Sequence, residues 1–172
     1  MLTILNVLNV VSTAQYFTVQ TPGVYSHNHT WLIVHSVVIT FKVRACEEAR
    51  ILLTESPYNL AVYSREVIIG GWNNTRSAIV KYGDNSTLTE RETRTILQCS
   101  ELQDFWIGWN KENGGRISVG KGVLGSGEFL THMDPDFSHI YGVSVSTGNG
   151  YTGEWQFPTT IGKVHCLTYY FY

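Results

Sequence analysis

The sequence is poor in charged residues. Asp, Glu, Lys and Arg make up 15% of its 172 residues, against the roughly 25% usual in soluble domains, and the formal net charge is −2. Nowhere do several Lys or Arg residues follow one another. Binding to nucleic-acid phosphates or to an anionic membrane surface depends on such basic clusters. We therefore expect no nucleic-acid partner and no polybasic contact with a membrane.

Long hydrophobic runs are also absent. No stretch reaches the ~20 apolar residues that a membrane-spanning helix needs, so we expect no transmembrane segment. The chain does open on a short apolar stretch, Leu2–Val11, followed by the small residues Ser12, Thr13 and Ala14. That order is typical of a secretory signal, although no basic residue follows Met1. We interpret residues 1–14 as a signal peptide or its remnant, with an N-terminal strand as the alternative.

Alternation of strand and helix patterns, the mark of a parallel α/β fold, is missing as well. Residues 89–104 are the one stretch that tolerates a helix, since they are rich in Glu, Arg, Leu and Gln. They also hold three Thr residues and show no apolar stripe with a 3.6-residue period. We predict a strand there, followed by a short turn of helix around Ser100–Asp104.

What the sequence does have is β-forming residues and glycine. Aromatic residues reach 13%, and there are 16 glycines. Residues 39–45 alternate strictly between apolar and polar, as in a strand with one buried face, and Lys111–Gly115 has the Asn-Gly and Gly-Gly steps of a hairpin. Strand patterns occupy 39–45, 49–54, 66–70, 77–81, 105–109, 116–119, 128–132, 140–146, 153–157 and 163–171. They predict one all-β domain over residues 15–172, an antiparallel, jelly-roll-like β-sandwich with little or no helix.

Cysteines and glycosylation motifs favour an oxidising, extracellular setting. The three cysteines allow one disulfide and one unpaired thiol. Acceptor motifs for N-linked glycans lie at Asn28, Asn73 and Asn85. We therefore expect a secreted glycoprotein.

Six separated blocks resemble one known family. They are FKVRACEEARILL (41–53), VIIGGWNNTRSAIV (67–80), ILQCSELQDFWIGW (96–109), RISVGKG (116–122), Asp134-Pro135-Asp136, and YGVSVSTGNGYTGEW (141–155). In order and spacing they are similar to the farnesoic acid O-methyltransferase-like domain, a module of many animal proteins. The resemblance covers roughly residues 16–157. The tail with Cys166 extends beyond it.

The family name implies methyl transfer from S-adenosylmethionine to a farnesoic-acid-like carboxylate. Common methyltransferases hold that cofactor at a Gly-rich turn between a strand and a helix. Here the Gly-rich pieces, such as Gly70-Gly71, lie between strand patterns, and no Gly-x-Ser-x-Gly nucleophile motif occurs. We therefore expect no cofactor and a non-catalytic module that binds a glycan or an extracellular protein. The O-methyltransferase stays open as the alternative.

Two of the family blocks contain Cys46 and Cys99. We hypothesise that they form a disulfide, with two reduced thiols as the alternative. Cys166 would then be free or would link two chains. A third interpretation of function follows, in which the module assembles with copies of itself through Cys166 or through the aromatic terminal strand Lys163–Tyr172.

The block VIIGGWNNTRSAIV holds the candidate binding residues. Trp72 offers a ring face on which a sugar can stack, and Asn74 and Arg76 offer directional donors. The alternative is a plain turn, with Trp72 in the core and the two asparagines at the tip. If Asn73 is glycosylated, the turn is exposed, and direct binding there is less favoured.

Other motifs have simpler interpretations. His27 and His29 would share one face of a strand, but no nearby ligand completes a metal set. Asp134 and Asp136 supply too few oxygens for calcium and fit a turn. We expect no metal site. In the segment 105–109 we assign Phe105, Ile107 and Trp109 to the core and Trp106 to the opposite face, and we assign Trp155 to the core.

Overall fold

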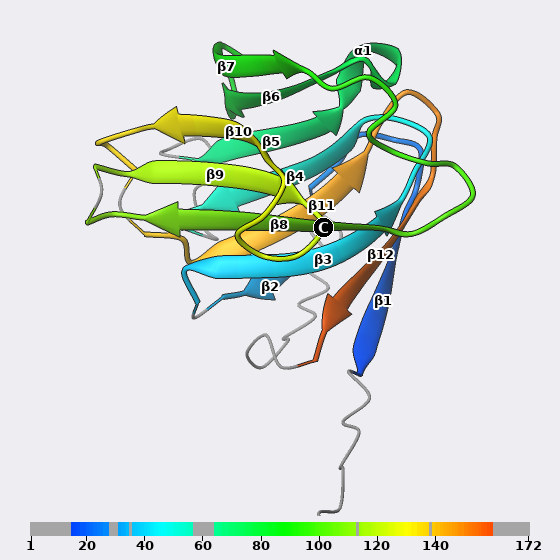
Figure 1. Ribbon diagram of the computed structural model, residues 1–172, viewed down its shortest axis with the longest axis horizontal. Coiled ribbons are helices and arrows are strands. Elements are labelled where there is room, and N and C mark those ends of the chain that lie inside the picture. Colours follow the sequence, from blue (N-terminus) through cyan, green and yellow to red (C-terminus); the bar gives the residue numbers. More distant parts are fainter. Residues whose placement is uncertain are drawn as a thin grey trace, which may run out of the picture.

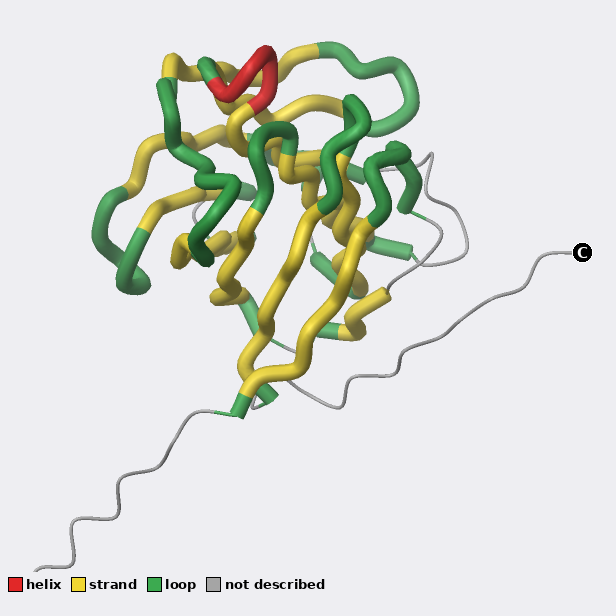
Figure 2. The backbone as a smooth tube through the Cα atoms, turned by 90° about the vertical axis from the view of Figure 1, so that its right-hand side faces the viewer, coloured by secondary structure: helices red, strands yellow, loops and turns green. Residues whose placement is uncertain are grey.

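The chain folds into two stacked antiparallel sheets (Figure 1, Figure 2). The computed structural model describes residues 15–27, 31–34, 36–56, 64–112, 114–137 and 139–159. Sheet A contains, in order, β1 (Tyr16–Thr21), β12 (Gly153–Pro158), β3 (Val38–Arg44), β8 (Gln103–Asn110), β9 (Arg116–Lys121) and β10 (Glu128–Met133). Sheet B contains β2 (Trp31–Ile33), β11 (Gly142–Thr147), β4 (Ala49–Thr54), β5 (Arg65–Gly70), β6 (Arg76–Lys81) and β7 (Thr87–Glu92). This confirms the predicted all-β sandwich.

An aromatic cluster fills the centre of the sandwich. The Phe41 ring lies 5.9 Å from Phe105, 5.8 Å from Trp155 and 5.9 Å from Phe157, measured between ring centroids. All four rings are buried, as expected for Phe105 and Trp155. Because each large ring removes much apolar surface from water, this cluster supplies a major part of the hydrophobic stabilisation.

Trp106 points to the outer face of sheet A, as the strand period predicts, yet it is buried. The connection between β9 and β10 covers it, and its indole Nε1–H donates to the carbonyl of Ser126 at 2.8 Å. The ring lies directly on Gly120, where an added Cβ would come within 2.3 Å of it. A glycine is therefore required on the neighbouring strand.

The nine predicted strand ranges that fall on described residues, from 39–45 to 153–157, agree with the observed strands within two residues at each end, whereas the strand predicted at the start of 89–104 corresponds to β7, which already ends at Glu92. The pattern did not single out β1 and β2, and the predicted strand 163–171 lies outside the described residues, as does the expected signal segment 1–14. The helical turn predicted at Ser100–Asp104 is wrong. Residues 93–102 form a connection of turns and bends, and β8 already begins at Gln103.

Neighbouring strands are antiparallel throughout both sheets, so connections that alternate along the chain lie at the same end of the sandwich. The end that we call the disulfide end contains the described connecting residues 22–27, 45–48, 71–75, 93–102, 122–127 and 148–152. We call the other the opposite end. It contains the described connecting residues 34, 36–37, 55–56, 64, 82–86, 111–112, 114–115, 134–137 and 139–141. Figure 1 shows α1 and the long connection after β7 together at the disulfide end.

Candidate functional site

The β5–β6 connection is a left-handed turn, α1 (Gly71–Asn74). Its residues Trp72, Asn73 and Asn74 have φ values of 52°, 58° and 56°. Each left-handed L-residue costs about 1–2 kcal/mol, less for Asn, whose side chain tolerates this region. The turn begins at Gly70, where a Cβ would lie 2.6 Å from the Asn74 side chain and 2.7 Å from that of Leu97. This tight, strained geometry explains the Gly-Gly-Trp-Asn-Asn sequence.

The connection between β7 and β8 holds this turn in place. The Asn74 side chain donates to the Leu97 carbonyl at 3.0 Å and accepts from the Leu97 N–H at 3.2 Å. The Thr95 N–H donates to the Asn74 carbonyl at 2.8 Å. Farther along, Cys99 forms a disulfide with Cys46. Asn74, predicted as a ligand donor, therefore uses its side chain to position the turn.

The turn exposes the aromatic ring that the sequence singled out. Trp72 is 42% exposed, so the alternative that places it in the core is wrong. The Arg76 guanidinium lies over the ring, with its Cζ 4.9 Å from the centroid. Such a cation–π contact favours this relative orientation of the two groups. The exposed Trp72 ring thus has a fixed position beside a directional donor.

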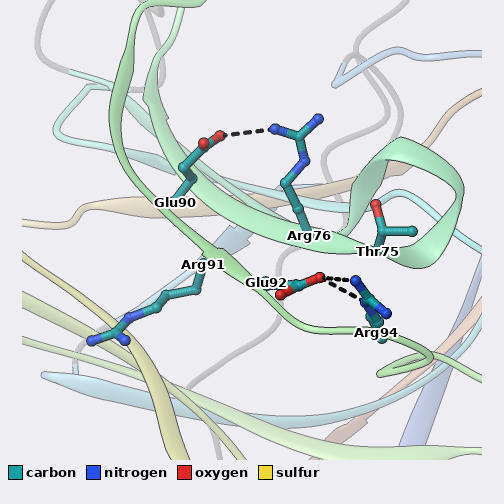
Figure 3. A pocket seen from close by; sticks show the side chains of 6 residues that line it. All are labelled: Thr75, Arg76, Glu90, Arg91, Glu92 and Arg94. Carbon is teal, nitrogen blue, oxygen red and sulfur yellow. Dashed lines mark hydrogen bonds and ion pairs between the residues drawn. The ribbon is translucent and has the colours of Figure 1, made fainter.

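A groove of about 580 Å³ adjoins this pair, and we call it the Arg76 groove. Figure 3 shows the residues that line it, which are Thr75, Arg76, Glu90, Arg91, Glu92 and Arg94. Every one of them is polar or charged. They come from β6, from the sheet-edge strand β7 and from residues next to these strands.

The ion pairs of the groove are exposed. Arg76 Nη1 lies 3.6 Å from Glu90 Oε2, and Arg94 Nη2 lies 2.5 Å from Glu92 Oε1. Arg91 points away from both pairs (Figure 3). Exposed pairs contribute little to stability, about 0–1 kcal/mol each. Their side chains can therefore exchange these partners for the hydroxyl groups of a ligand at small cost.

A buried polar network supports the disulfide end from the outer face of sheet B. His27 Nε2 lies 2.6 Å from Glu66 Oε1, and both side chains are fully buried. Arg50 donates to Glu66 at 2.7 Å and also bonds Glu48. Glu48 has a φ of 57°, and its N–H donates to the Gly70 carbonyl at 2.9 Å. Through Glu48, the network is therefore hydrogen-bonded to Gly70, the residue at which the left-handed turn begins.

Electrostatics in this network follow from burial. Desolvation alone would lower the pKa of Arg50, but the neighbouring Glu66 and Glu48 outweigh it and raise that pKa. Burial first, and then the charge of Glu66, raise the pKa of Tyr25, whose ring lies 4.7 Å below the Arg50 Cζ. Tyr25 therefore stays a neutral phenol. Because breaking a buried ion pair leaves an unpaired charge, we interpret the network as a rigid support.

The remaining predicted residues have separate places. The acceptor residues Asn73 and Asn85 are exposed, and Asn28 lies outside the described residues. Asp134 forms a turn, where its carboxylate accepts from Arg65 Nε at 2.5 Å. Over the described ranges, no group of three or more His, Cys, Asp or Glu side chains is placed to hold a metal ion. Nor does the described part contain a helix long and apolar enough to span a bilayer.

Sequence reasoning missed most of the groove. Residues 90–94 follow a strand pattern with alternating charges, which is also how a protein protects an exposed sheet edge. Their position beside Trp72 depends on the pairing of Arg76 with Glu92 across β6 and β7. The dense run of Glu and Arg was the only available signal, and it did not specify a site.

Comparison with known proteins gives a family and a fold. A family model described as farnesoic acid O-methyl transferase matches residues 12–160. No curated protein sequence matches the chain. The carbohydrate-binding module CBM66 from Bacillus subtilis has a similar structure, with a TM-score of 0.52 and 12% identity, over 86% of this chain and 95% of that one. At this identity the similarity concerns the fold.

Two further solved structures have lower scores. A prokaryotic beta-1,3-1,4-glucanase (lichenase) from a mouse hindgut metagenome has a TM-score of 0.49 and 9% identity, over 83% of this chain and 78% of that one. The Caenorhabditis elegans galectin LEC-6 has a TM-score of 0.43 and 12% identity, over 83% of this chain and 94% of that one.

Proposed function

The chain belongs to the farnesoic acid O-methyl transferase family, and we propose that it is a secreted, non-catalytic recognition module that binds a glycan at its disulfide end. The observation behind this proposal is the exposed Trp72 ring, held in a left-handed turn beside a groove that polar and charged residues line. Sugars combine apolar CH faces with many hydroxyl groups. They therefore match an aromatic ring next to Arg, Glu and Thr side chains.

Rigidity of the site supports the same function. Strained backbone persists where the surrounding structure holds it, and it is found most often at functional sites. The turn is held by Asn74 and by the connection that contains Cys99. A ring fixed in advance loses little conformational entropy on binding. The known carbohydrate-binding role of the module from Bacillus subtilis, which has a similar fold, favours a ligand of the same class.

Secretion is part of the proposal. The Cys46–Cys99 disulfide favours an oxidising compartment, and exposed Asn73 and Asn85 are accessible to glycosylation. Expression in animal cells should place the protein in the medium, and removal of N-linked glycans should lower its mass. Retention of the unmodified protein in the cytosol would contradict secretion.

A glycan array with the bacterially produced, unglycosylated chain tests the binding function. We expect at least one glycan class to bind and Trp72→Ala to weaken that binding by about tenfold or more. The matched control is Tyr141→Ala, since Tyr141 is an exposed aromatic residue of the opposite end. An array without hits, or equal binding by the wild type and Trp72→Ala, would contradict the proposal. Hits on an extracellular-protein array alone would identify the other class of ligand.

Methyl transfer is the second candidate function, and the family description favours it. In the structure, Gly70-Gly71 leads into the left-handed turn rather than into a helix that could hold a cofactor at its first turn. Calorimetry with S-adenosylmethionine separates the two functions. Micromolar binding of S-adenosylmethionine would favour the enzyme, whereas the recognition module should give no heat of binding.

A further inference from the structure

We propose that the disulfide end contains a second binding site, which takes one residue of a neutral sugar. The site is a hollow of about 250 Å³ on the other side of the connection between β7 and β8, and we call it the Tyr151 pocket. Arg94 of this connection lines the Arg76 groove, and Cys99 of the same connection lines the Tyr151 pocket. The second site does not require that the Arg76 groove bind a ligand.

Three neighbouring strands supply one wall of the Tyr151 pocket. In the register of sheet A, Gln20 of β1 pairs with Glu154 of β12, and Glu154 pairs with Arg44 of β3. The three side chains therefore form a row across the outer face of the sheet. Arg44 Nη2 donates to Glu154 Oε2 at 2.5 Å. This row presents an amide, a carboxylate and a guanidinium to the pocket, all directional partners for sugar hydroxyls.

Tyr151, in the turn between β11 and β12, also lines the pocket. Tyr151 is 42% exposed, and no hydrogen bond to another described residue uses its hydroxyl group. Its own backbone is fixed, because the Tyr151 N–H donates to the Gly148 carbonyl at 3.0 Å and the Gly150 N–H donates to the Gly23 carbonyl at 2.9 Å. The ring is therefore an exposed apolar surface on an ordered turn, where the CH face of a sugar can stack.

Rigid walls complete the pocket. The Cys46–Cys99 disulfide lines it and ties the connection after β3 to the connection before β8. Beneath it, the indole N–H of Trp155 donates to the Thr21 hydroxyl at 3.0 Å, and the Thr21 and Thr147 hydroxyls lie 2.9 Å apart. These buried bonds fix the strand ends from which the lining residues project. The hollow is therefore present before a ligand arrives.

Charge distinguishes the ligand of this pocket from that of the Arg76 groove. In the Tyr151 pocket, Arg44 and Glu154 are one cation and one anion and compensate each other. The Arg76 groove holds three Arg and two Glu residues, so it has a surplus of one positive charge. A pocket whose charges compensate each other suits an uncharged ligand, because a charged ligand would lose its hydration there without gaining a partner of opposite charge. We therefore assign a neutral sugar to the Tyr151 pocket.

The test is a titration of the ¹⁵N-labelled full chain with methyl glycosides of glucose, galactose and mannose and with fructose, each at millimolar concentration. We expect at least one sugar to shift the amide signals of Tyr151, Thr152 and Gly153. Tyr151→Ala should weaken this binding by about tenfold or more. The second variant is Gln20→Ala, which shortens an exposed side chain on β1. It should also weaken sugar binding. Tyr141→Ala and Trp72→Ala are the controls and should leave it unchanged.

The outcomes separate the two sites. An absence of shifts at residues 151–153 with every sugar would overturn the second site, as would equal binding by wild type, Tyr151→Ala and Gln20→Ala. Loss of the shifts in Trp72→Ala would overturn the second site as well, because it would show that one ligand site explains both. Shifts at residues 151–153 together with a blank glycan array would support the Tyr151 pocket and contradict binding at the Arg76 groove.

Discussion

The two ends of the sandwich differ in the backbone conformation of their non-glycine residues. Of the described non-glycine residues with positive φ, all but Asn85 belong to the disulfide end. Those at the disulfide end are Glu48, Trp72, Asn73, Asn74, Thr95 and Asn149. Both ends have hydrogen bonds between different connections, for example from the Asp134 N–H to the Gly115 carbonyl at the opposite end. At the opposite end most positive φ values fall on glycines, namely Gly83, Gly114 and Gly115, so the two ends differ in the residue types that adopt the left-handed region.

The difference indicates which end has a binding function. Left-handed L-residues cost free energy, and Trp72 stays 42% exposed, so its ring gains less from burial than a ring in the core would. The opposite end places glycine at most of its positive-φ positions, where this conformation carries little strain, and it uses local caps, such as the Asp84 carboxylate that accepts from the Ser86 N–H at 2.8 Å. We therefore expect substitutions at the opposite end to alter stability alone. Substitutions at the disulfide end should alter stability and binding together.

Loss of the disulfide should have the largest effect on the disulfide end. The bridge spans 53 residues of sequence, so the double variant Cys46→Ser, Cys99→Ser should lose about 4 kcal/mol of unfolding free energy on the chain-entropy model. Urea unfolding measures this loss. A reducing agent should destabilise the wild type and leave the double variant unchanged. Equal stability of wild type and double variant would show that the bridge does not constrain the chain.

Breaking the buried ion pair of the opposite end should come next. Arg65 and Asp134 are both nearly fully buried, so Asp134→Ala leaves an unpaired guanidinium and should cost about 3 kcal/mol. Urea unfolding measures the loss, and a glycan-binding titration at a temperature where the variant is folded should give the affinity of the wild type. Weaker binding by folded Asp134→Ala would break the distinction between the two ends.

A smaller loss should follow from Asn74→Ala. This substitution removes both side-chain bonds to Leu97 and should cost about 1–2 kcal/mol. It should also weaken glycan binding, because the Trp72 turn loses its attachment. The matched control is Asn110→Ala, since Asn110 caps the Glu112 N–H at 2.8 Å in a turn of the opposite end. Weakened binding in both variants, or in neither, would contradict a positioning role for Asn74.

Thr95→Gly should raise stability. Thr95 is β-branched and has a φ of 53°, a conformation that glycine adopts without strain. We expect a gain of about 0.5 kcal/mol in the free energy of unfolding, since the greater chain entropy of unfolded glycine offsets part of the relieved strain. Thermal unfolding measures it. A loss of stability would show that residue 95 is not strained.

The smallest effect on stability should come from removing the Asp84 cap at the opposite end. Hydrogen bonds from Ser86 lower the pKa of Asp84 below its ordinary value. A carboxylate with a lowered pKa in the folded state stabilises the fold above its unfolded pKa and loses that contribution as the pH falls through the folded pKa. Asp84→Ala should therefore be slightly less stable than wild type at neutral pH. The two proteins should converge in acid, and a difference that persists there would contradict the cap.

The sequence predicted the sandwich better than the site. Strand periods are local, so residues 39–45 and 105–109 were assigned to the correct faces without knowledge of their partners. The groove depends on the pairing of β6 with β7 and on the left-handed turn after Gly70. A glycine at position 70 is compatible with that turn but does not predict it. Asn74 shows the limit of such reasoning. Its amide suits a ligand as well as a backbone, and its actual partner, Leu97, lies 23 residues away in the sequence.

Chemical-shift mapping with the best glycan from the array tests the comparison of the two ends most directly. Addition of that glycan to the ¹⁵N-labelled chain should shift amide signals at the disulfide end, in residues 71–76 and 90–95, and the Trp72 indole signal among them. Residues 82–86 and 111–115 of the opposite end should keep their positions. Shifts confined to the opposite end, with the Trp72 signals unchanged at saturation, would contradict glycan recognition at the disulfide end.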